Sequence, residues 1–364
     1  MTDATTPKGG RLESLDTLRG IAILMVIAFH VSIHFRPVAW LGSLAKFGNQ
    51  GVQLFFLISA ITMCFMWQQR STETQRSLKF YIRRFFRIAP LFWVAILFYM
   101  LWESTHEFPR PADILGWKQV VLTTFFLHGF SPSSINAVVP GGWSIAVEMS
   151  FYVVFPLLAA RRATAVQTLA FALVAYLVLG VAMTTFVERF LAPDPIFVYY
   201  SLLTQFPIFP IGMFIYAVAM RGEQCNPWQV AAIAAAWLGV AFIGKVVFDL
   251  DTRPYFWVQV ALFALFIHVI IRRGIHVAIL SLMGTLSYSM YLFHFAIIDV
   301  FAMFTPPEWR DGTLSFVTFL VLVLVATTAA AKMSGVTLEQ WSSDMARAVI
   351  ARMGRSKARR LTAE

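Results

Sequence analysis

The stretch that decides the fold is residues 15–35, with the sequence LDTLRGIAILMVIAFHVSIHF. It is almost purely apolar, apart from Asp16 and Arg19 at its start and His30 and His34, which lie four residues apart near its end. The eleven residues from Arg19 to His30 advance by ~16 Å along a helix axis. If Arg19 marks one membrane face, His30 lies inside the bilayer, where an ionisable side chain is costly and normally faces a cavity or a partner that uses it. The alternative is a histidine packed between helices and bonded to a backbone carbonyl.

The composition indicates a polytopic helical membrane protein. Of the 364 residues, 59% are hydrophobic and 13% are charged, and the mean hydropathy is +0.70, which excludes an ordinary soluble domain. The net charge of +10 comes from short segments between apolar runs and from both termini, which is typical of cytoplasmic loops rather than of nucleic-acid binding. The first apolar run is followed by no small-residue cleavage site, so we expect no cleavable signal peptide. Cys64 and Cys225 form neither a disulfide framework nor a metal-binding motif.

The distribution of basic residues predicts ten membrane spans. Eleven apolar stretches are present, but both termini are basic and should lie in the cytoplasm, so one stretch fails to cross. The stretch 115–130 is the shortest and carries Lys118, Gln119 and His128; if it does not cross, the basic loops that follow it all fall inside. We therefore expect an all-α polytopic fold with ten transmembrane helices and one re-entrant or interfacial segment on the outer side. The expected spans are 17–36, 48–69, 80–102, 142–160, 163–187, 199–220, 227–248, 254–271, 277–302 and 314–333. The chain would then consist of a cytoplasmic segment 1–14, a membrane domain 15–335 that contains these spans, and a basic cytoplasmic tail 336–364.

Three ionisable residues are predicted to share one depth in this topology. Glu148 follows the start of the fifth apolar stretch by a little over one turn, and His294 lies in the outer half of the late stretch 277–302. A buried carboxylate beside the imidazole of His30 would orient its tautomer and stabilise its cation, as a histidine that removes a proton from a hydroxyl requires. The alternative is that Glu148 forms an ion pair that only fixes helix packing.

A second candidate site is the segment 79–90, KFYIRRFFRIAP. Arg83 and Arg87 share one helix face, and Arg84 lies beside it. Guanidinium groups bind phosphates bidentately, so the cluster suits an anionic, phosphate-bearing ligand that arrives from the cytoplasm. Positive-inside anchoring alone is the competing explanation. His30 and His34 share a helix face, but neither a following glutamate nor a third ligand is evident, so we expect no metal site.

Five short motifs, in order along the chain, give a resemblance to a known family. They are LDTLRG with His30, GNQGVQLFFLIS, RRFFRIAP, GGWSIAVE and SYSMYLFH. In this order they resemble the motifs of the acyltransferase 3 family of integral membrane O-acyltransferases. Thr17 and Ala60 stand where the family usually has glycine, and neither change removes an ionisable group.

The resemblance implies specific roles for residues of this chain. Arg19 and His30 would form the arginine–histidine pair of the first span, with His294 in the late histidine motif, and His30, Glu148, Arg19 and His294 would be catalytic. Trp143, Ser144 and Tyr288 would bind substrate. Arg83, Arg84 and Arg87 would bind the acyl donor, most simply acetyl-CoA, with its thioester directed along a channel toward His30.

The resemblance also implies the reaction and its location. We expect O-acetylation of a bacterial exopolysaccharide or O-antigen unit at the outer side of the inner membrane, either directly or through an acyl-histidine. Both termini should be cytoplasmic, and the oligomeric state is left open. Larger relatives carry an additional esterase-like domain, and the short segment after the last span leads us to expect none here. A transporter for a small anionic or sugar solute is the rival class, although no inverted repeat is visible.

Overall fold

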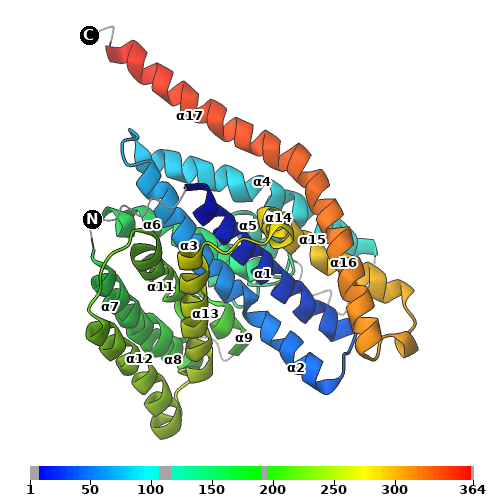
Figure 1. The fold of residues 1–364 in the computed structure, drawn as a ribbon. Coiled ribbons are helices and arrows are strands. Elements are labelled where there is room, and N and C mark those ends of the chain that lie inside the picture. The colour runs from blue at the N-terminus through cyan, green and yellow to red at the C-terminus, as the bar shows by residue number, and fades with distance from the viewer. Residues whose placement is uncertain (1–7, 106–115, 162, 191–194, 362–364) are drawn as a thin grey trace.

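In the computed structural model, the described residues are 8–105, 116–161, 163–190 and 195–361. Within these ranges the regular structure is entirely helical (Figure 1). The first half contains α1 (Lys8–His34), α2 (Ala39–Phe47), η1 (Gly48–Gln50), α3 (Gly51–Gln69), α4 (Arg76–Thr105), α5 (Trp117–Thr124), η3 (His128–Phe130) and α6 (Gly142–Ala160). The second half contains α7 (Ala165–Ala175), η4 (Tyr176–Met183), α8 (Thr184–Phe190), α9 (Pro195–Tyr200), α10 (Leu202–Gln205), α11 (Ile208–Ile215), η5 (Tyr216–Met220), α12 (Pro227–Phe248), α13 (Pro254–Arg273), α14 (Ala278–Thr285), α15 (Ser287–Phe304), η6 (Pro307–Trp309), α16 (Thr313–Ser334), η7 (Gly335–Glu339) and α17 (Gln340–Leu361).

Ten helical segments in the described ranges are long and apolar enough to cross a membrane, which confirms the predicted all-α polytopic fold. Each corresponds to one of the ten expected spans. They are Leu12–His34, Ala39–Gln69, Arg76–Trp102, Gly142–Ala160, Ala165–Phe190, Leu202–Met220, Pro227–Phe248, Pro254–Arg273, Ser287–Phe304 and Thr313–Met353.

The stretch 116–130 is not one of these spans. Its only α-helix, α5, has eight residues and advances ~12 Å, far less than the ~30 Å of a bilayer core. The segment is nonetheless packed into the protein, because the imidazole of His128 is buried and its Nε2 lies 3.0 Å from the carbonyl oxygen of Gly142. Burial lowers the pKa of His128 below its ordinary value of 6.5. His128 therefore fixes this segment, as a neutral side chain, against the start of α6.

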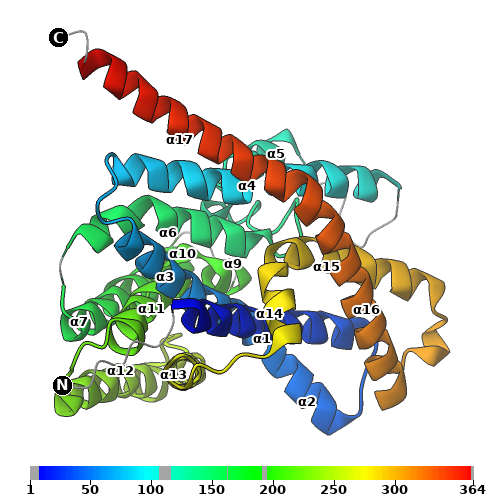
Figure 2. The ribbon, with the colours of Figure 1, turned by 45° about the horizontal axis from the view of Figure 1, so that its top comes forward.

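The predicted span 277–302 is wrong in one respect, since it is two helices rather than one. The chain turns at Leu286, and the short α14 crosses α1 (Figures 1 and 2). The crossing is very close: a Cβ at Gly20 would lie 1.9 Å from the carbonyl oxygen of Leu280, and a Cβ at Gly284 would lie 1.8 Å from that of Asp16. Small residues permit such an approach between membrane helices. The glycines thereby bring the polar start of α1 beside the start of α15.

The segment after α16 (Thr313–Ser334) is helical and packs against the protein. From α16 the chain continues through the π-helical η7 into α17. Figures 1 and 2 show α17 lying along α4 and extending beyond it. The helix thus runs without interruption through the expected boundary at residue 335.

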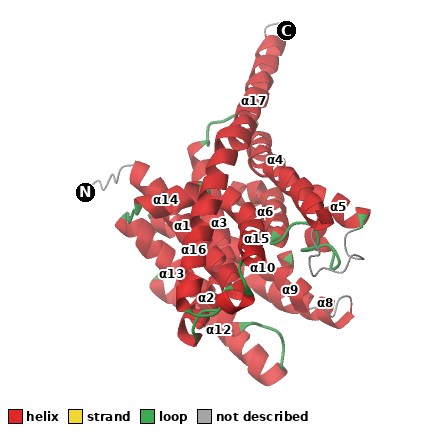
Figure 3. Cartoon of the chain, turned by 90° about the vertical axis from the view of Figure 1, so that its right-hand side faces the viewer, coloured by secondary structure: helices red, strands yellow, loops and turns green. Residues whose placement is uncertain are grey.

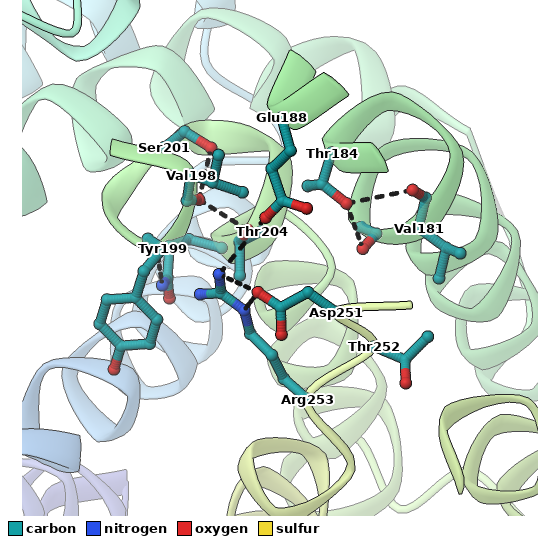
Figure 4. A network of polar contacts seen from close by, with 12 residues as sticks. Val181, Thr184, Glu188, Val198, Tyr199, Ser201, Thr204, Asp251, Thr252 and Arg253 are labelled. Carbon is teal, nitrogen blue, oxygen red and sulfur yellow. Dashed lines mark hydrogen bonds and ion pairs between the residues drawn. The ribbon is translucent and has the colours of Figure 1, made fainter. Parts of the chain in front are cut away.

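Helix α1 lies at the centre of the bundle and contacts α3, α14, α15 and α16 (Figure 3). A second group of helices, α7, α11, α12 and α13, lies to one side (Figure 1). One end of this group is held by Arg253, whose Nη2 lies 2.5 Å from Asp251 and 4.0 Å from Glu188 (Figure 4). The guanidinium carbon of Arg253 lies 5.1 Å from the ring centroid of Tyr199. This network links α8, α9 and the loop before α13.

Candidate active site

A cavity of about 450 Å³, lined by both polar and apolar side chains, lies between α1, α3, α4, α6 and the α14–α15 turn. It brings together motifs that are far apart in the sequence. Its lining includes Asp16, Arg19, Ser59, Thr62, Arg84, Arg87, Ser144, Glu148, Tyr152, Thr285, Ser287, Tyr288 and Tyr291, with apolar side chains that include Val52, Phe55, Phe56 and Ile88. Six of the predicted site residues therefore face a common space: Arg19, Arg84, Arg87, Ser144, Glu148 and Tyr288.

Arg19 is held in this cavity by polar contacts at both ends of its guanidinium group. Its Nη1 donates to Asp16 at 2.5 Å, and its Nη2 donates to the hydroxyl of Thr62 at 2.5 Å. Asp16 is one helical turn away on α1, whereas Thr62 belongs to α3. The guanidinium is thus fixed in orientation, so Arg19 is a fixed positive charge in the wall of the cavity.

The structure does not make the predicted contact between Glu148 and His30. One oxygen of Glu148 instead accepts hydrogen bonds from Ser59 and Tyr152, each at 2.5 Å. Tyr152 is one turn along α6, and Ser59 comes from α3. Ser144 and Glu148 are four residues apart on α6, which is about one helical turn. Glu148 lies on the side of Ser144 away from the histidines. Glu148 faces the cavity, but its hydrogen bonds cannot orient the His30 imidazole.

The histidine partner of His30 is His294. Its Nε2 lies 3.2 Å from the Nδ1 of His30, and its own Nδ1 lies 2.7 Å from the carbonyl oxygen of Tyr291. The Nδ1 of His30 also lies 2.9 Å from the carbonyl oxygen of Val26. A ring of Phe295 packs on His30 with a centroid distance of 4.4 Å. The two imidazoles thus form a pair fixed by two backbone carbonyls.

These contacts determine which ring nitrogens carry hydrogen. A carbonyl oxygen can only accept, so the Nδ1 of His294 donates to Tyr291 and the Nε2 of neutral His294 carries a lone pair. The Nδ1 of His30 then faces two acceptors, Val26 oxygen and His294 Nε2, and must be the protonated nitrogen. The lone pair of neutral His30 is consequently on Nε2. The sequence analysis predicted that Glu148 would set the tautomer of His30. In the structure His294 sets it.

The cavity ends one helical turn short of the histidine pair. At this end Tyr291 donates to the carbonyl oxygen of Gly141 at 2.9 Å, and Ser144 lies 2.9 Å from the Tyr291 hydroxyl. Gly141 has φ of 73°, and a Cβ there would lie 2.7 Å from that hydroxyl, so only glycine fits. His30 and His294 are not among the lining residues; His30 is half-buried and His294 fully buried.

A second cavity of about 520 Å³, named the inner cavity after the expected topology, adjoins the first, and the two share Met66, Arg84 and Arg87. Arg83 lines only the inner cavity, where it forms a bidentate pair with Glu73 at 2.5 and 3.0 Å. The hydrogen bond from Arg83 is the main cause that lowers the pKa of Glu73 below its ordinary value. The guanidinium carbon of Arg84 lies over the rings of Phe80 and Tyr152. Arg84 and Arg87 are therefore the arginines at the junction of the two cavities.

The remaining predicted residues have different surroundings. Tyr288 lines the first cavity and donates to the carbonyl oxygen of Ile88 at 2.7 Å, which ties α15 to α4. Trp143 lines neither cavity; its ring stacks on Tyr200 at a centroid distance of 4.5 Å. This contact packs the start of α6 against α9.

Among the lining residues to which the sequence reasoning assigned no site role are Ser59, Tyr152, Gly284 and Tyr291. Tyr152 lies four residues after Glu148, and Tyr291 lies three residues before His294, so helical spacing would have indicated both. Ser59 and Gly284 offer no local signal, because their importance depends on which helix crosses which.

Fold and site define this protein as a multi-pass membrane protein with two adjoining, arginine-lined cavities, the first of which ends one helical turn short of a histidine pair. The chain belongs to the acyltransferase family whose model is described as an acyltransferase domain, and residues 12–332 match it. This is the family that the motifs resembled.

The OatA proteins that match the chain are larger than it. The peptidoglycan O-acetyltransferase OatA of Listeria monocytogenes is 25% identical over 353 residues, covering 86% of this chain and 54% of that protein. The O-acetyltransferase OatA of Staphylococcus aureus is 23% identical, with the same coverage. The exopolysaccharide production protein ExoZ of Rhizobium meliloti is 34% identical over 110 residues, 30% of this chain and 33% of that protein. The chain thus spans about half the length of the OatA proteins it matches. No solved structure matches it.

Proposed function

We propose that this protein is a membrane O-acyltransferase that moves an acetyl group from cytoplasmic acetyl-CoA to a sugar hydroxyl of a surface polysaccharide. The supporting names are those of the relatives, two of which are called O-acetyltransferases and one an exopolysaccharide production protein. The donor would enter from the cytoplasmic side of a bacterial inner membrane, and the acceptor would approach from outside. The proposal includes an exopolysaccharide or O-antigen unit as the acceptor. It also includes the placement of both termini in the cytoplasm.

The observation that carries the proposal is the pair of adjoining cavities, because its dimensions suit an acyl-CoA. Arg84 and Arg87 line the same cavity as Arg19, and His30 lies ~16 Å beyond Arg19 along α1. The arm of CoA between its pyrophosphate and its sulfur contains about twelve bonds, and an extended chain advances ~1.2 Å per bond, hence ~14 Å in total. A pyrophosphate bound at the arginines would therefore hold the thioester near the histidine pair.

The chemistry follows from the tautomer of His30. Its Nε2 takes the proton of the acceptor hydroxyl while the alkoxide oxygen attacks the thioester carbon. The carbon–sulfur bond breaks, and the proton passes from His30 to the sulfur, so that the ester and free CoA leave with no net change in protons. The same lone pair could instead attack first and form an acyl-histidine that the hydroxyl then cleaves. Both routes require the imidazole orientation that His294 imposes.

Transfer of labelled acetyl from acetyl-CoA to surface glycan, in membranes of matched protein abundance, tests the proposal. We expect His30→Ala to abolish transfer, and His294→Ala to lower kcat by roughly 10²-fold or more with little change in the KM for donor. His34→Ala is the matched control: it lies one turn further on α1, pairs with Asp299 at 3.9 Å, and should retain activity. Near-normal transfer by His30→Ala would refute the catalytic assignment, and the absence of acetyl transfer by the unmodified protein would refute the function.

A further inference from the structure

We infer that helix α17, which lies beyond the family match ending at residue 332, forms one wall of the acyl-donor site, and that Arg347 binds the phosphate on the ribose of the donor nucleotide. This inference rests on the proposed function and extends it to a helix and a residue outside the matched region. The inner cavity lies between α4 and α17. The residues of η7 and α17 that line it are Glu339, Ser343, Ala346, Arg347, Ile350 and Ala351.

The position of α17 is tied to the RRFFRIAP motif by a hydrogen bond that Pro90 makes necessary. Pro90 lies inside α4 and has no N–H, so the carbonyl oxygen of Phe86, four residues earlier, loses its helical donor. An unpaired backbone carbonyl is costly in a membrane protein. The hydroxyl of Ser342, itself buried, donates to this carbonyl. The proline of the motif thus creates the acceptor on which α17 is anchored.

A second anchor connects α17 to the arginine cluster itself. Glu339 is the last residue of the π-helix η7, a local geometry that often occurs at functional sites. Its carboxylate accepts a hydrogen bond from Ser289 and lies 3.8 Å from Nη1 of Arg87. The start of α17 is therefore fixed relative to both α15 and the junction of the two cavities.

The charges of the inner cavity, which also include Arg70, are distributed so that Arg347 is available to a ligand. Arg76 donates to the backbone of Trp67 and stacks on its ring, and Arg83 is paired with Glu73. The Arg347 side chain is 73% exposed, and its ion pair is with Asp344, one turn earlier and 54% exposed. An exposed pair of this kind contributes little energy, so a phosphate competes for the guanidinium easily.

The arrangement of the donor points to the same residue. A pyrophosphate at Arg84 and Arg87 places the nucleotide in the inner cavity, against the α17 wall. Buried Ala346, with Ile350 and Phe80, supplies apolar surface for a base. The other charged element of the nucleotide is the doubly charged 3′-phosphate, and Arg347 is the cation that α17 contributes to the lining. Bidentate binding of a phosphate is the recognition for which arginine is suited.

Comparing two donors tests the inference: acetyl-CoA and acetyl-dephospho-CoA, which lacks only the 3′-phosphate. With purified protein in detergent, we expect the unmodified enzyme to show a KM roughly tenfold higher for the dephospho donor. Arg347→Ala should raise the KM for acetyl-CoA by a similar factor and leave the KM for the dephospho donor unchanged, which abolishes the discrimination. Arg352→Ala is the control, since Arg352 is exposed on the same helix and is not a lining residue.

The outcomes separate this inference from the function on which it rests. If the unmodified protein consumes neither donor, the proposed function itself fails. If it uses acetyl-CoA and Arg347→Ala keeps the full discrimination between donors, only the role of Arg347 is refuted. A lipid headgroup offers the same phosphate chemistry. A loss of activity that is equal for both donors, and that appears only in vesicles with anionic lipid, would assign Arg347 to the membrane surface and overturn the inference.

Discussion

Replacing Gly284 by alanine should abolish most of the proposed acetyl transfer without removing any polar group of the site. The added Cβ would lie 1.8 Å from the carbonyl oxygen of Asp16, and contacts below 3.0 Å are essentially not found for a real Cβ. Helices α1 and α14 must therefore separate by at least about 1.2 Å. The three nearest atoms all belong to the backbone of Asp16, so no flexible side chain can move aside to make room. The separation must consequently be taken up by the helices themselves.

The displacement acts directly on the cavity. Asp16 holds Arg19, and Gly284 and Thr285 belong to the lining beside Tyr288. A shift of ~1 Å in a catalytic arrangement can cost about 10²-fold in rate, whereas overpacking of this kind costs only ~1–3 kcal/mol of stability. We therefore expect Gly284→Ala to be present in the membrane and to transfer acetyl groups at about 1% of the normal rate.

The assay is acetyl transfer at matched membrane abundance, with thermal unfolding in detergent as the measure of stability. Gly239→Ala is the matched control, because Gly239 also lies in a membrane helix, α12, and a Cβ there meets nothing within 4 Å. This control should be fully active. A Gly284→Ala protein with a normal rate would show that the close crossing does not position the site, and would refute the reasoning.

Three further predictions concern the donor site, the topology and the segment 116–130. Arg84→Ala should raise the KM for acetyl-CoA roughly tenfold or more, and Arg83→Ala should raise it less because Arg83 is paired with Glu73; equal effects in a donor titration would contradict this. Cys225 is partly exposed and Cys64 is buried, so a maleimide should label Cys225 rather than Cys64. Because the expected topology places Cys225 in the cytoplasm, a membrane-impermeant maleimide should label it only after the inner membrane is opened. Labelling of Cys225 in intact spheroplasts would overturn the topology. Because burial lowers the pKa of His128 below 6.5, its contribution to stability is present above about pH 6.5 and is lost as the pH falls toward its folded pKa. Thermal unfolding measured between about pH 7.5 and 5.5 should show this loss. His128→Asn should make the unfolding temperature depend less steeply on pH, and an unchanged dependence would contradict the prediction.

The sequence by itself determined the class of the protein and much of its topology. Ten membrane spans followed from apolar runs and loop charges, and the exclusion of 115–130 as a span followed from its length and polar residues; the structure describes that stretch from residue 116. These properties are local, because a helix in a bilayer satisfies its backbone groups within its own segment. The residue types of the site were also identifiable, since an ionisable side chain in an apolar run is conspicuous.

Only the tertiary structure decided which of these residues meet. The expected depth in the membrane placed Glu148, His30 and His294 together. In the structure each side chain points in the direction its helix face sets, so Glu148 accepts hydrogen bonds from Ser59 and Tyr152, and His30 pairs with His294. Likewise, nothing local shows that Gly284 faces Asp16 or that Ser342 reaches Phe86, more than two hundred residues earlier. A membrane helix can rotate about its axis and cross its neighbours at many angles with the same hydropathy. The contacts that orient a catalytic group are set by close packing between helices, and that packing is a property of the assembled bundle.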